Sequence, residues 1–351
     1  MDGANTMLAL QKVKKGVGHI ELRDVPEPEP QPGWVKIEVR AAAICGTDIH
    51  IRHDAYPYWP PVTLGHEFSG VIAELGEGVE GWEVGDRVVA EPHTLACGEC
   101  WLCRQGHVQI CAEKRSPGWG IDGAFAKYVV MESKLLHALP DNVGFDAGAL
   151  VEPTANTMHD VGERAKVEPE DFVVVMGPGP IGLLAAQVAK GAGAREVMIV
   201  GTPADADLRL PTAEKVGIDH VINLAEQDPV EVCLDLTDGR GADLVVECSG
   251  AAPAINQAVD LVRKKGRICV IGMTGRDEIQ FSWDAAIFKG IDVFFNISTS
   301  YTSWDRAISV IEKGKVDAEA LITHRESLEN WEEVFDALEE QKGIKALLIP
   351  E

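Results

Sequence analysis

Residues 172–190 read FVVVMGPGPIGLLAAQVAK, and this stretch decides the fold. The apolar run 172–176 predicts a buried strand, and residues 181–190 predict a helix. Gly177, Gly179 and Gly182 match the pattern G-x-G-x-x-G, with Pro180 and Ile181 inside it. After a strand and before a helix, such glycines let the backbone approach a pyrophosphate, and the helix N-terminus offers N–H donors and a positive dipole. We therefore predict an α/β domain that binds a dinucleotide.

The chain on either side of this stretch has two different patterns, which change near residue 155. Downstream, apolar runs alternate with helix-like segments, as in a parallel sheet covered by helices. These runs cover 196–200, 243–247, 267–271 and 292–295. Upstream, short β-rich runs are separated by glycine and proline turns, which predicts a compact, largely antiparallel β domain with short helices. The clearest of them cover 34–41, 69–75 and 87–90.

The strand that follows the glycine turn ends without the acid that commonly binds an adenosine ribose. About twenty residues beyond the glycines, where Asp or Glu holds the ribose hydroxyls, the sequence reads Val-Gly-Thr-Pro. Thr202 lies at this point, and Asp205, Asp207 and Arg209 follow. Arg209 could attract the 2′-phosphate of NADP, whereas Asp205 could reach back to the ribose of NAD. We expect Thr202 and Arg209 to contact the cofactor, and the choice between NAD and NADP stays open.

Four clustered cysteines form the strongest metal-binding pattern. Their spacing, C-x2-C-x2-C-x7-C, suits a tetrahedral site of four thiolates, and Gly98 permits a tight turn. An iron–sulfur cluster is the alternative at this spacing, but nothing else in the chain indicates electron transfer through a cluster. Because the pattern leaves no open coordination position, we predict a structural zinc ion. Its ligands are Cys97, Cys100, Cys103 and Cys111.

A second group of metal ligands comes earlier in the chain. Cys45 begins the run CGTDIH, and His66 lies in the run GHE. A catalytic zinc ion needs about three protein ligands and one exchangeable position. Cys45 and His66 supply two ligands, and Glu152 in the run VEP is the best candidate for the third. Glu67 could bind the metal at times or tune it from behind, so the third ligand of the resting state stays open.

The composition narrows the choice of partners. Lys and Arg number 32 and Asp and Glu number 56, so the formal net charge of the 351 residues is −24. An acidic surface repels nucleic-acid phosphates and anionic lipid, and we expect neither as a partner. No uninterrupted run of about 18 apolar residues predicts a membrane span, and the N-terminus lacks the apolar core of a signal peptide. We expect a cytoplasmic protein with a small-molecule substrate.

These motifs, in this order, resemble the zinc-containing medium-chain dehydrogenase/reductase family over essentially the whole chain. The sorbitol (iditol) and L-threonine dehydrogenase branch is the most similar, because Glu152 stands where liver-type alcohol dehydrogenases place a cysteine ligand. The resemblance implies a GroES-like catalytic domain over 1–155, with the structural-zinc lobe at about 93–115, completed by 297–351. It implies a Rossmann domain over 156–296, a catalytic and a structural zinc ion in each subunit, and a homotetramer.

The resemblance also implies catalytic roles close to the first zinc ligand. Thr47 matches the hydroxyl residue that takes the substrate proton, and His50 matches the end of a relay to solvent. Asp48 fits the carboxylate that orients a zinc-bound histidine. Two departures leave the substrate open. Ile-Ser-Thr-Ser at 297–300 replaces the Arg-Tyr pair of sorbitol dehydrogenases, and His93 resembles the threonine dehydrogenase pattern.

The sequence therefore predicts a zinc-dependent oxidoreductase that transfers a hydride between a secondary alcohol and NAD or NADP, with an alcohol and its ketone as substrate pair. A polyol or sugar alcohol is the expected substrate. L-Threonine 3-dehydrogenase activity is the first alternative, and a non-catalytic NADPH-binding protein of the same fold is a second. The intact zinc ligands count against the second alternative, and they equally count against a zinc-free quinone or enone reductase.

Overall fold

The computed structural model describes residues 5–351 and divides the chain into two compact units. The first unit comprises Met1–Glu152 and Ile322–Glu351, and the second comprises Pro153–Leu321. Residues 1–4 of the predicted catalytic domain lie outside the described residues. The predicted boundaries between the catalytic domain and the Rossmann domain, at 155/156 and 296/297, stay a prediction.

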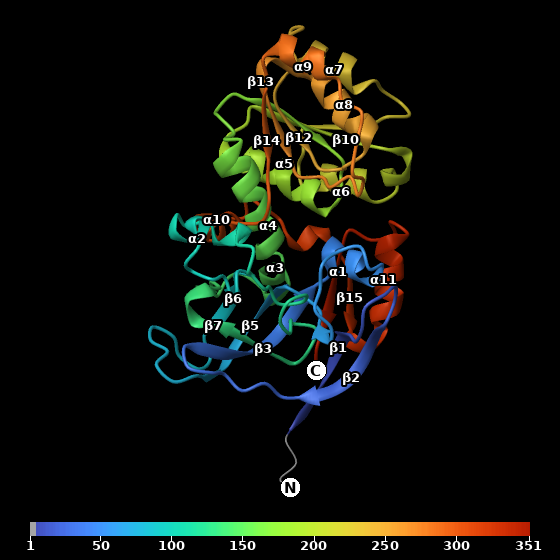
Figure 1. Cartoon of the computed structure of the whole chain (residues 1–351). Coiled ribbons are helices and arrows are strands. Elements are labelled where there is room, and N and C mark those ends of the chain that lie inside the picture. Colours follow the sequence, from blue (N-terminus) through green and yellow to red (C-terminus); the bar gives the residue numbers. More distant parts are fainter. Residues whose placement is uncertain (1–4) are drawn as a thin grey trace. The chain divides into compact units, whose positions relative to one another are not determined.

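The second unit is built on a parallel six-stranded sheet (Figure 1). Its order is β11-β10-β9-β12-β13-β14, the order of a doubly wound dinucleotide-binding sheet. Every neighbouring pair is parallel. The strands are β9 (Phe172–Met176), β10 (Glu196–Gly201), β11 (His220–Asn223), β12 (Ala242–Glu247), β13 (Val262–Val270) and β14 (Asp292–Phe295). The predicted runs thus form strands, whereas β11 was not among them.

Helices cover both faces of this sheet, because the strands bury side chains on both sides. All residues of β9 and β12 are buried, so each face needs an apolar cover. In Figure 1, α5 and α6 lie on one side of the sheet and α7, α8 and α9 on the other. The helices are α5 (Pro180–Ala192), α6 (Arg209–Lys215), α7 (Pro229–Leu236), α8 (Ala252–Leu261), α9 (Trp283–Lys289) and α10 (Tyr301–Glu312).

The first unit is the predicted β-rich domain. A seven-stranded sheet has the order β15-β16-β3-β5-β6-β8, with β7 paired to β3, and a three-stranded sheet has the order β2-β1-β4. All pairs are antiparallel except β15 with β16. The strands are β1 (Thr6–Lys12), β2 (Ile20–Pro26), β3 (Trp34–Ala43), β4 (Val62–Thr63), β5 (Glu67–Leu75), β6 (Arg87–Ala90), β7 (Tyr128–Glu132), β8 (Leu136–Ala138), β15 (Ile322–Ser327) and β16 (Lys345–Ile349).

Short helices connect these strands, and the C-terminal segment completes the sheet. The helices are α1 (Gly46–Arg52), α2 (Trp101–Arg104), α3 (Phe145–Ala149), α4 (Val151–Thr157), which crosses into the second unit, and α11 (Trp331–Glu339). β16 pairs with the end of β3, where Leu347 faces Ala43. Together the two units confirm the predicted α/β fold class. Within residues 5–351, no helix is both long and apolar enough to cross a membrane.

The glycine turn after β9 gives a test of the fold. A Cβ atom on residue 182 would lie 1.9 Å from Gly177 O, whereas a Cβ on residue 179 would have nothing within 4 Å. We expect Gly182→Ala to destabilise the protein by about 2 kcal/mol or more, since overpacking forces the backbone to shift. Gly179→Ala should leave the urea midpoint unchanged. Equal urea midpoints for the two variants would contradict this reading of the turn.

Candidate functional site

The four predicted structural-zinc cysteines lie together around α2. Their ligand atoms all fall within 4.8 Å of one another. The Sγ atoms of Cys97 and Cys103 are 3.9 Å apart, and those of Cys97 and Cys111 are 3.6 Å apart. A tetrahedron with Zn–S bonds of about 2.3 Å has edges of about 3.8 Å between sulfur atoms. The four thiols therefore fit a zinc ion without rearrangement.

Backbone N–H groups donate hydrogen bonds to three of these sulfur atoms, and such bonds lower the pKa of Cys100 and Cys111. Cys100 N donates to Cys97 Sγ at 3.4 Å, and Cys103 N donates to Cys100 Sγ at 3.5 Å. The N–H of Cys97 donates to Cys111 Sγ and lowers the pKa of Cys111 to about 6. Gly98, at φ +71°, makes the turn that directs these groups inward. Thiolates are the form that binds metal, so the lobe is prepared for a cation.

The second group comprises Cys45, His66 and Glu67, whose ligand atoms also lie within 4.8 Å of one another. The pairing of β3 with β5 creates this group, because Ala43 faces Glu67 in the antiparallel register. Cys45 lies just beyond the end of β3 and caps α1, and His66 immediately precedes β5. Two segments about twenty residues apart in the sequence thus place their ligands side by side.

The charges around His66 favour a cation in this group. His66 is buried, and its Nδ1 atom has no hydrogen-bond partner among residues 5–351. Burial alone would lower the pKa of His66, but the charge and hydrogen bond of Cys45, followed by the charges of Asp48 and Glu152, raise it to about 10. The groups around His66 therefore favour a positive charge at this position. A zinc ion among the same atoms would supply that charge and use a neutral imidazole as ligand.

Asp48, predicted to orient His66, bonds to the backbone on both sides of the group. Its carboxylate accepts hydrogen bonds from Cys45 N at 2.9 Å and from Gly65 N at 3.3 Å. The side chain is fully buried, and burial raises the pKa of Asp48 despite attraction to His66. Asp48 thus fixes the two segments that carry Cys45 and His66, while its action on the imidazole ring itself stays a prediction.

Glu67 is held by a lysine that the sequence analysis did not single out. Lys345, in β16, forms a buried ion pair with Glu67 and donates a second hydrogen bond to Ile44 O at 2.9 Å. Burial alone would lower the pKa of Lys345, but the charges of Glu67 and Cys45 raise it above its usual value. One signal was available, since Lys345 opens the apolar run KALLI at the end of the chain.

Glu152, the predicted third ligand, lies near this group but is not one of its members. It sits in the first turn of α4 and is buried. Its charge acts on both His66 and Lys345, which places the carboxylate within electrostatic range of the site. The residue whose ligand atom lies within 4.8 Å of the other two is Glu67. The role of Glu152 therefore stays a prediction.

The predicted relay residues follow Cys45 on α1. The Cys45 thiol lies 3.7 Å from Thr47 Oγ1, so Thr47 faces the candidate zinc ligands. His50, one turn later, is exposed. His93 is buried, with its ring 3.7 Å from Glu91. Ser300 caps α10 and donates a hydrogen bond to Glu163 Oε2 at 2.6 Å, which gives this residue a structural task in the second unit.

The glycine turn has the predicted context, since it joins β9 directly to α5. Gly177 has φ +97°, and Gly179 is the extended N-cap of α5. Pro180 and Ile181 form the first turn of the helix, and Gly182 approaches Gly177 O closely. The turn therefore places glycine backbone at a helix N-terminus, the arrangement that binds a pyrophosphate.

Asp205, which the sequence analysis considered as a contact to the ribose of NAD, forms hydrogen bonds within its own loop. Its carboxylate accepts hydrogen bonds from Thr202 N at 2.9 Å and from Thr202 Oγ1 at 2.8 Å. Its other oxygen accepts one from Arg209 at 3.2 Å, and the side chain is buried. The Nε atom of Arg209 is buried without a hydrogen-bond partner among residues 5–351. Asp205 thus orders the loop that follows β10.

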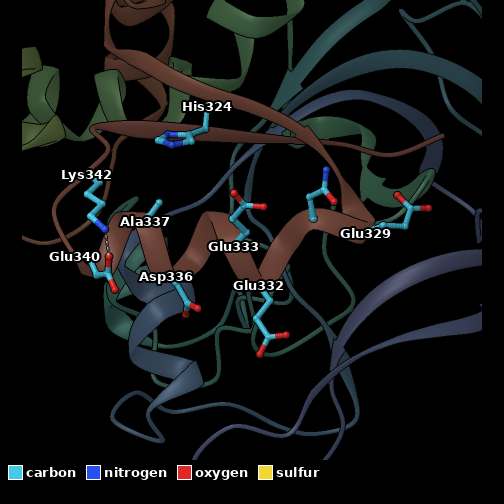
Figure 2. Close-up of a pocket in the computed structure, with 9 residues that line it drawn as sticks. His324, Glu329, Glu332, Glu333, Asp336, Ala337, Glu340 and Lys342 are labelled. Carbon is cyan, nitrogen blue, oxygen red and sulfur yellow. Dashed lines mark ion pairs between the residues drawn. The ribbon is translucent and has the colours of Figure 1, made fainter.

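A surface pocket of the first unit contains none of the predicted site residues. Figure 2 shows it beside α11 and β15, with mostly acidic side chains around it. An ion pair of 2.5 Å joins Lys342 to Glu340 at its edge. The lining residues are His324, Glu329, Asn330, Glu332, Glu333, Asp336, Ala337, Glu340 and Lys342. The pocket belongs to the acidic surface that gives the chain its charge of −24.

Comparison with known proteins finds matches over nearly the whole chain. Residues 31–141 match the model of the alcohol dehydrogenase GroES-like domain, and residues 180–313 match that of the zinc-binding dehydrogenases. A sorbitol dehydrogenase of Halalkalibacterium halodurans is 44% identical, covering 98% of this chain and 99% of the relative. An L-threonine 3-dehydrogenase of Pyrococcus horikoshii is 36% identical and a D-arabitol-phosphate dehydrogenase of Enterococcus avium 34% identical, each over 98% of both chains.

Solved structures agree with these matches. A zinc-binding dehydrogenase of Sinorhizobium meliloti 1021 bound to NADP superposes with a TM-score of 0.91 at 31% identity, covering 99% of this chain and 100% of the other. An alcohol dehydrogenase of Escherichia coli CFT073 in complex with NADH superposes with a TM-score of 0.87 at 28% identity, with the same coverage. Proteins of this fold thus include one bound to NADP and one bound to NADH.

The Glu67–Lys345 pair gives a test of how the second group is built. We expect Lys345→Met to lower the free energy of unfolding by about 3–5 kcal/mol, because it leaves a buried carboxylate without its countercharge. The double variant Glu67→Gln with Lys345→Met should recover most of this loss, since both charges of the pair are then removed together. Urea denaturation measures both. A single variant as stable as the parent would contradict the buried ion pair.

Proposed function

Because the chain belongs to the family of zinc-containing alcohol dehydrogenases, we propose that it oxidises a secondary alcohol to a ketone with a nicotinamide dinucleotide as the hydride acceptor. A polyol or sugar alcohol is the substrate class that we infer. The observation that carries the proposal is the group formed by Cys45, His66 and Glu67, with the hydroxyl of Thr47 beside it. The relative named sorbitol dehydrogenase, at 44% identity, supports the substrate class.

The chain's own residues would bind the metal and move a proton. Cys45, His66 and a carboxylate would hold zinc, which supplies a Lewis acid that lowers the pKa of an alcohol when bound. Thr47 would accept the hydroxyl proton of the substrate and pass it toward His50, whose exposed ring exchanges protons with solvent. Asp48 keeps the segments of Cys45 and His66 in place through its two backbone hydrogen bonds.

The dinucleotide that we infer is NADP. No acid stands at the end of β10, and Asp205 is buried with its oxygens bonded to Thr202 and Arg209. An adenosine ribose with a free 2′-hydroxyl therefore loses its usual carboxylate acceptor. Arg209 adds a positive charge in the first turn of α6, which favours a 2′-phosphate. The relative bound to NADP supports this choice.

L-Threonine is the alternative substrate. The relative named L-threonine 3-dehydrogenase is 36% identical over 98% of both chains, and buried His93 matches the pattern that the sequence shares with that branch. The test is the initial rate of dinucleotide reduction, measured with each dinucleotide against pentitols, hexitols, simple alcohols and L-threonine. Polyol oxidation that is lost on metal chelation supports the proposal. Oxidation of L-threonine alone favours the alternative. If no substrate is oxidised although zinc is present, a non-catalytic dinucleotide-binding protein is favoured.

We also infer a homo-oligomer, with a tetramer as the resemblance implies, which forms through the β14 edge of the second unit. β14 is the last strand of its sheet, so within residues 5–351 its outer backbone groups have no neighbouring strand. Phe288 is 81% exposed and Phe295 74%, and Trp283 and Ile297 are also exposed. On a chain of charge −24, a group of exposed apolar side chains next to a free strand edge is suited to a second copy of itself.

The relay residue gives a direct test of the mechanism. We expect Thr47→Val to lower kcat by about a hundredfold or more, the usual worth of a positioned proton acceptor. Zinc content and dinucleotide affinity should stay unchanged, because Val has nearly the same shape. Thr47→Ser, which keeps the hydroxyl, is the matched control and should retain most of the turnover. A Thr47→Val variant that works at the rate of the parent would remove Thr47 from the mechanism.

The β14 surface gives a second test. We expect Phe295→Glu to reduce the molar mass in solution, because a carboxylate cannot be buried in an apolar interface without a partner. Val84→Glu, in the first unit and 64% exposed, is the matched control and should leave the mass unchanged. Light scattering after size-exclusion chromatography measures the mass. A parent protein that is monomeric, or a Phe295→Glu variant of unchanged mass, would contradict the proposed interface.

A further inference from the structure

Three aromatic side chains form a continuous wall in the first unit, which we call the aromatic wall: Tyr56, Trp59 and Trp119. Tyr56 meets Trp119 edge to face, with ring centroids 5.9 Å apart and planes at 82°. The ring centroids of Trp59 and Trp119 are 5.7 Å apart, and Trp59 N donates a hydrogen bond to Trp119 O at 2.9 Å. The wall therefore joins the loop after α1 to the loop that carries Trp119.

The aromatic wall lies beside the candidate zinc ligands. The loop that carries Trp119 packs on the backbone of Gly65, the residue before His66. A Cβ on residue 118 would lie 3.0 Å from Gly65 N, and a Cβ on residue 123 would lie 2.1 Å from Gly65 O. On the side of Tyr56, burial together with the charges of Cys45 and Glu152 raises the pKa of the phenol. The wall is thus next to the residues on which the reaction depends.

A lysine ammonium stands over this wall. Lys114 Nζ lies 5.9 Å from the centroid of the Trp119 ring. Its side chain is half-buried. No hydrogen bond or ion pair engages this ammonium among residues 5–351, whereas the neighbouring Arg115 donates to Lys114 O at 2.9 Å.

A half-buried ammonium without an acceptor in the protein is best satisfied by an anionic oxygen. Aromatic faces next to it can pack against the carbon chain of a polyol, as they do in many ligand sites. Arg115 adds a second cation at the same place, since its guanidinium lies 4.0 Å over the Trp59 ring. Two cations thus lie beside one aromatic wall on a chain with a net charge of −24.

We propose that Lys114 and the aromatic wall bind an anionic group, a phosphate or a carboxylate, carried by the alcohol substrate. This inference rests on the proposed function, since it assigns the far end of the molecule that is oxidised at Cys45 and His66. Lys114 is then a specificity residue, which forms a charge-assisted hydrogen bond with the anion. A neutral polyol reaches the same zinc ligands but leaves the ammonium with only its hydroxyl groups as acceptors.

The experiment compares sorbitol, sorbitol 6-phosphate and gluconate in the parent, Lys114→Met and Lys114→Arg. We expect the parent to prefer one of the two anionic substrates over sorbitol by about tenfold or more in kcat/KM, the effect of one charge-assisted hydrogen bond. Which of the two it prefers identifies the anion. In Lys114→Met that preference should vanish, because KM for the anionic substrate rises at nearly constant kcat while KM for sorbitol changes much less. Lys114→Arg should restore the preference.

Two controls separate failure of this inference from failure of the proposed function. Lys134→Met removes an exposed lysine of the same unit, whose side chain is 73% exposed, and should change nothing. Equal kcat/KM for neutral and anionic substrates in the parent, or an equal loss for both in Lys114→Met, overturns the inference while leaving the dehydrogenase intact. If no substrate turns over, calorimetry with sorbitol 6-phosphate decides it. Binding that is lost in Lys114→Met supports the anion site, and binding that is absent or unchanged overturns it.

Discussion

The buried ion pair between Glu67 and Lys345 connects the three segments on which the candidate zinc site depends. Glu67 starts β5, Lys345 starts β16, and the second hydrogen bond of Lys345 goes to the residue before Cys45. The partners are 278 positions apart, so the candidate zinc ligands near the N-terminus depend on the C-terminal strand. An isolated buried carboxylate would be too costly, and its countercharge also keeps Glu67 from acting as a free anion beside the zinc ligands.

The parts of this architecture that were predictable from the sequence are those encoded locally. The cysteine lobe spans residues 97–111, and the glycine turn follows its strand directly, so spacing alone placed both. Lys345 could not be placed in this way, because its partner lies at the other end of the chain. The hydrogen bonds of Asp205 with its own loop could not be predicted either. The sequence allowed its carboxylate to reach a ribose as well as to cap that loop.

The same limit applies to specificity. Trp59, Tyr56 and Trp119 were visible as aromatic residues in loops, but their ring contacts arise only because two loops meet beside Gly65. Lys114 follows the last lobe cysteine by a few positions. It becomes a candidate specificity residue only because its ammonium lies over the Trp119 ring. The reaction class thus follows from ligands close together in the sequence, whereas the substrate depends on contacts between distant loops, where relatives of the same fold can differ without losing the chemistry.

The most direct test of the central claim is the zinc content of the purified protein, measured together with its turnover, in the parent, Cys45→Ser and Cys103→Ser. The account predicts one zinc ion for each of the two ligand groups in the parent. Cys45→Ser should lose one ion and all turnover while keeping its fold. Cys103→Ser should lose the other ion and part of its stability. A Cys45→Ser variant that keeps its full zinc content and activity would contradict the assignment of Cys45 and His66 to a catalytic zinc site.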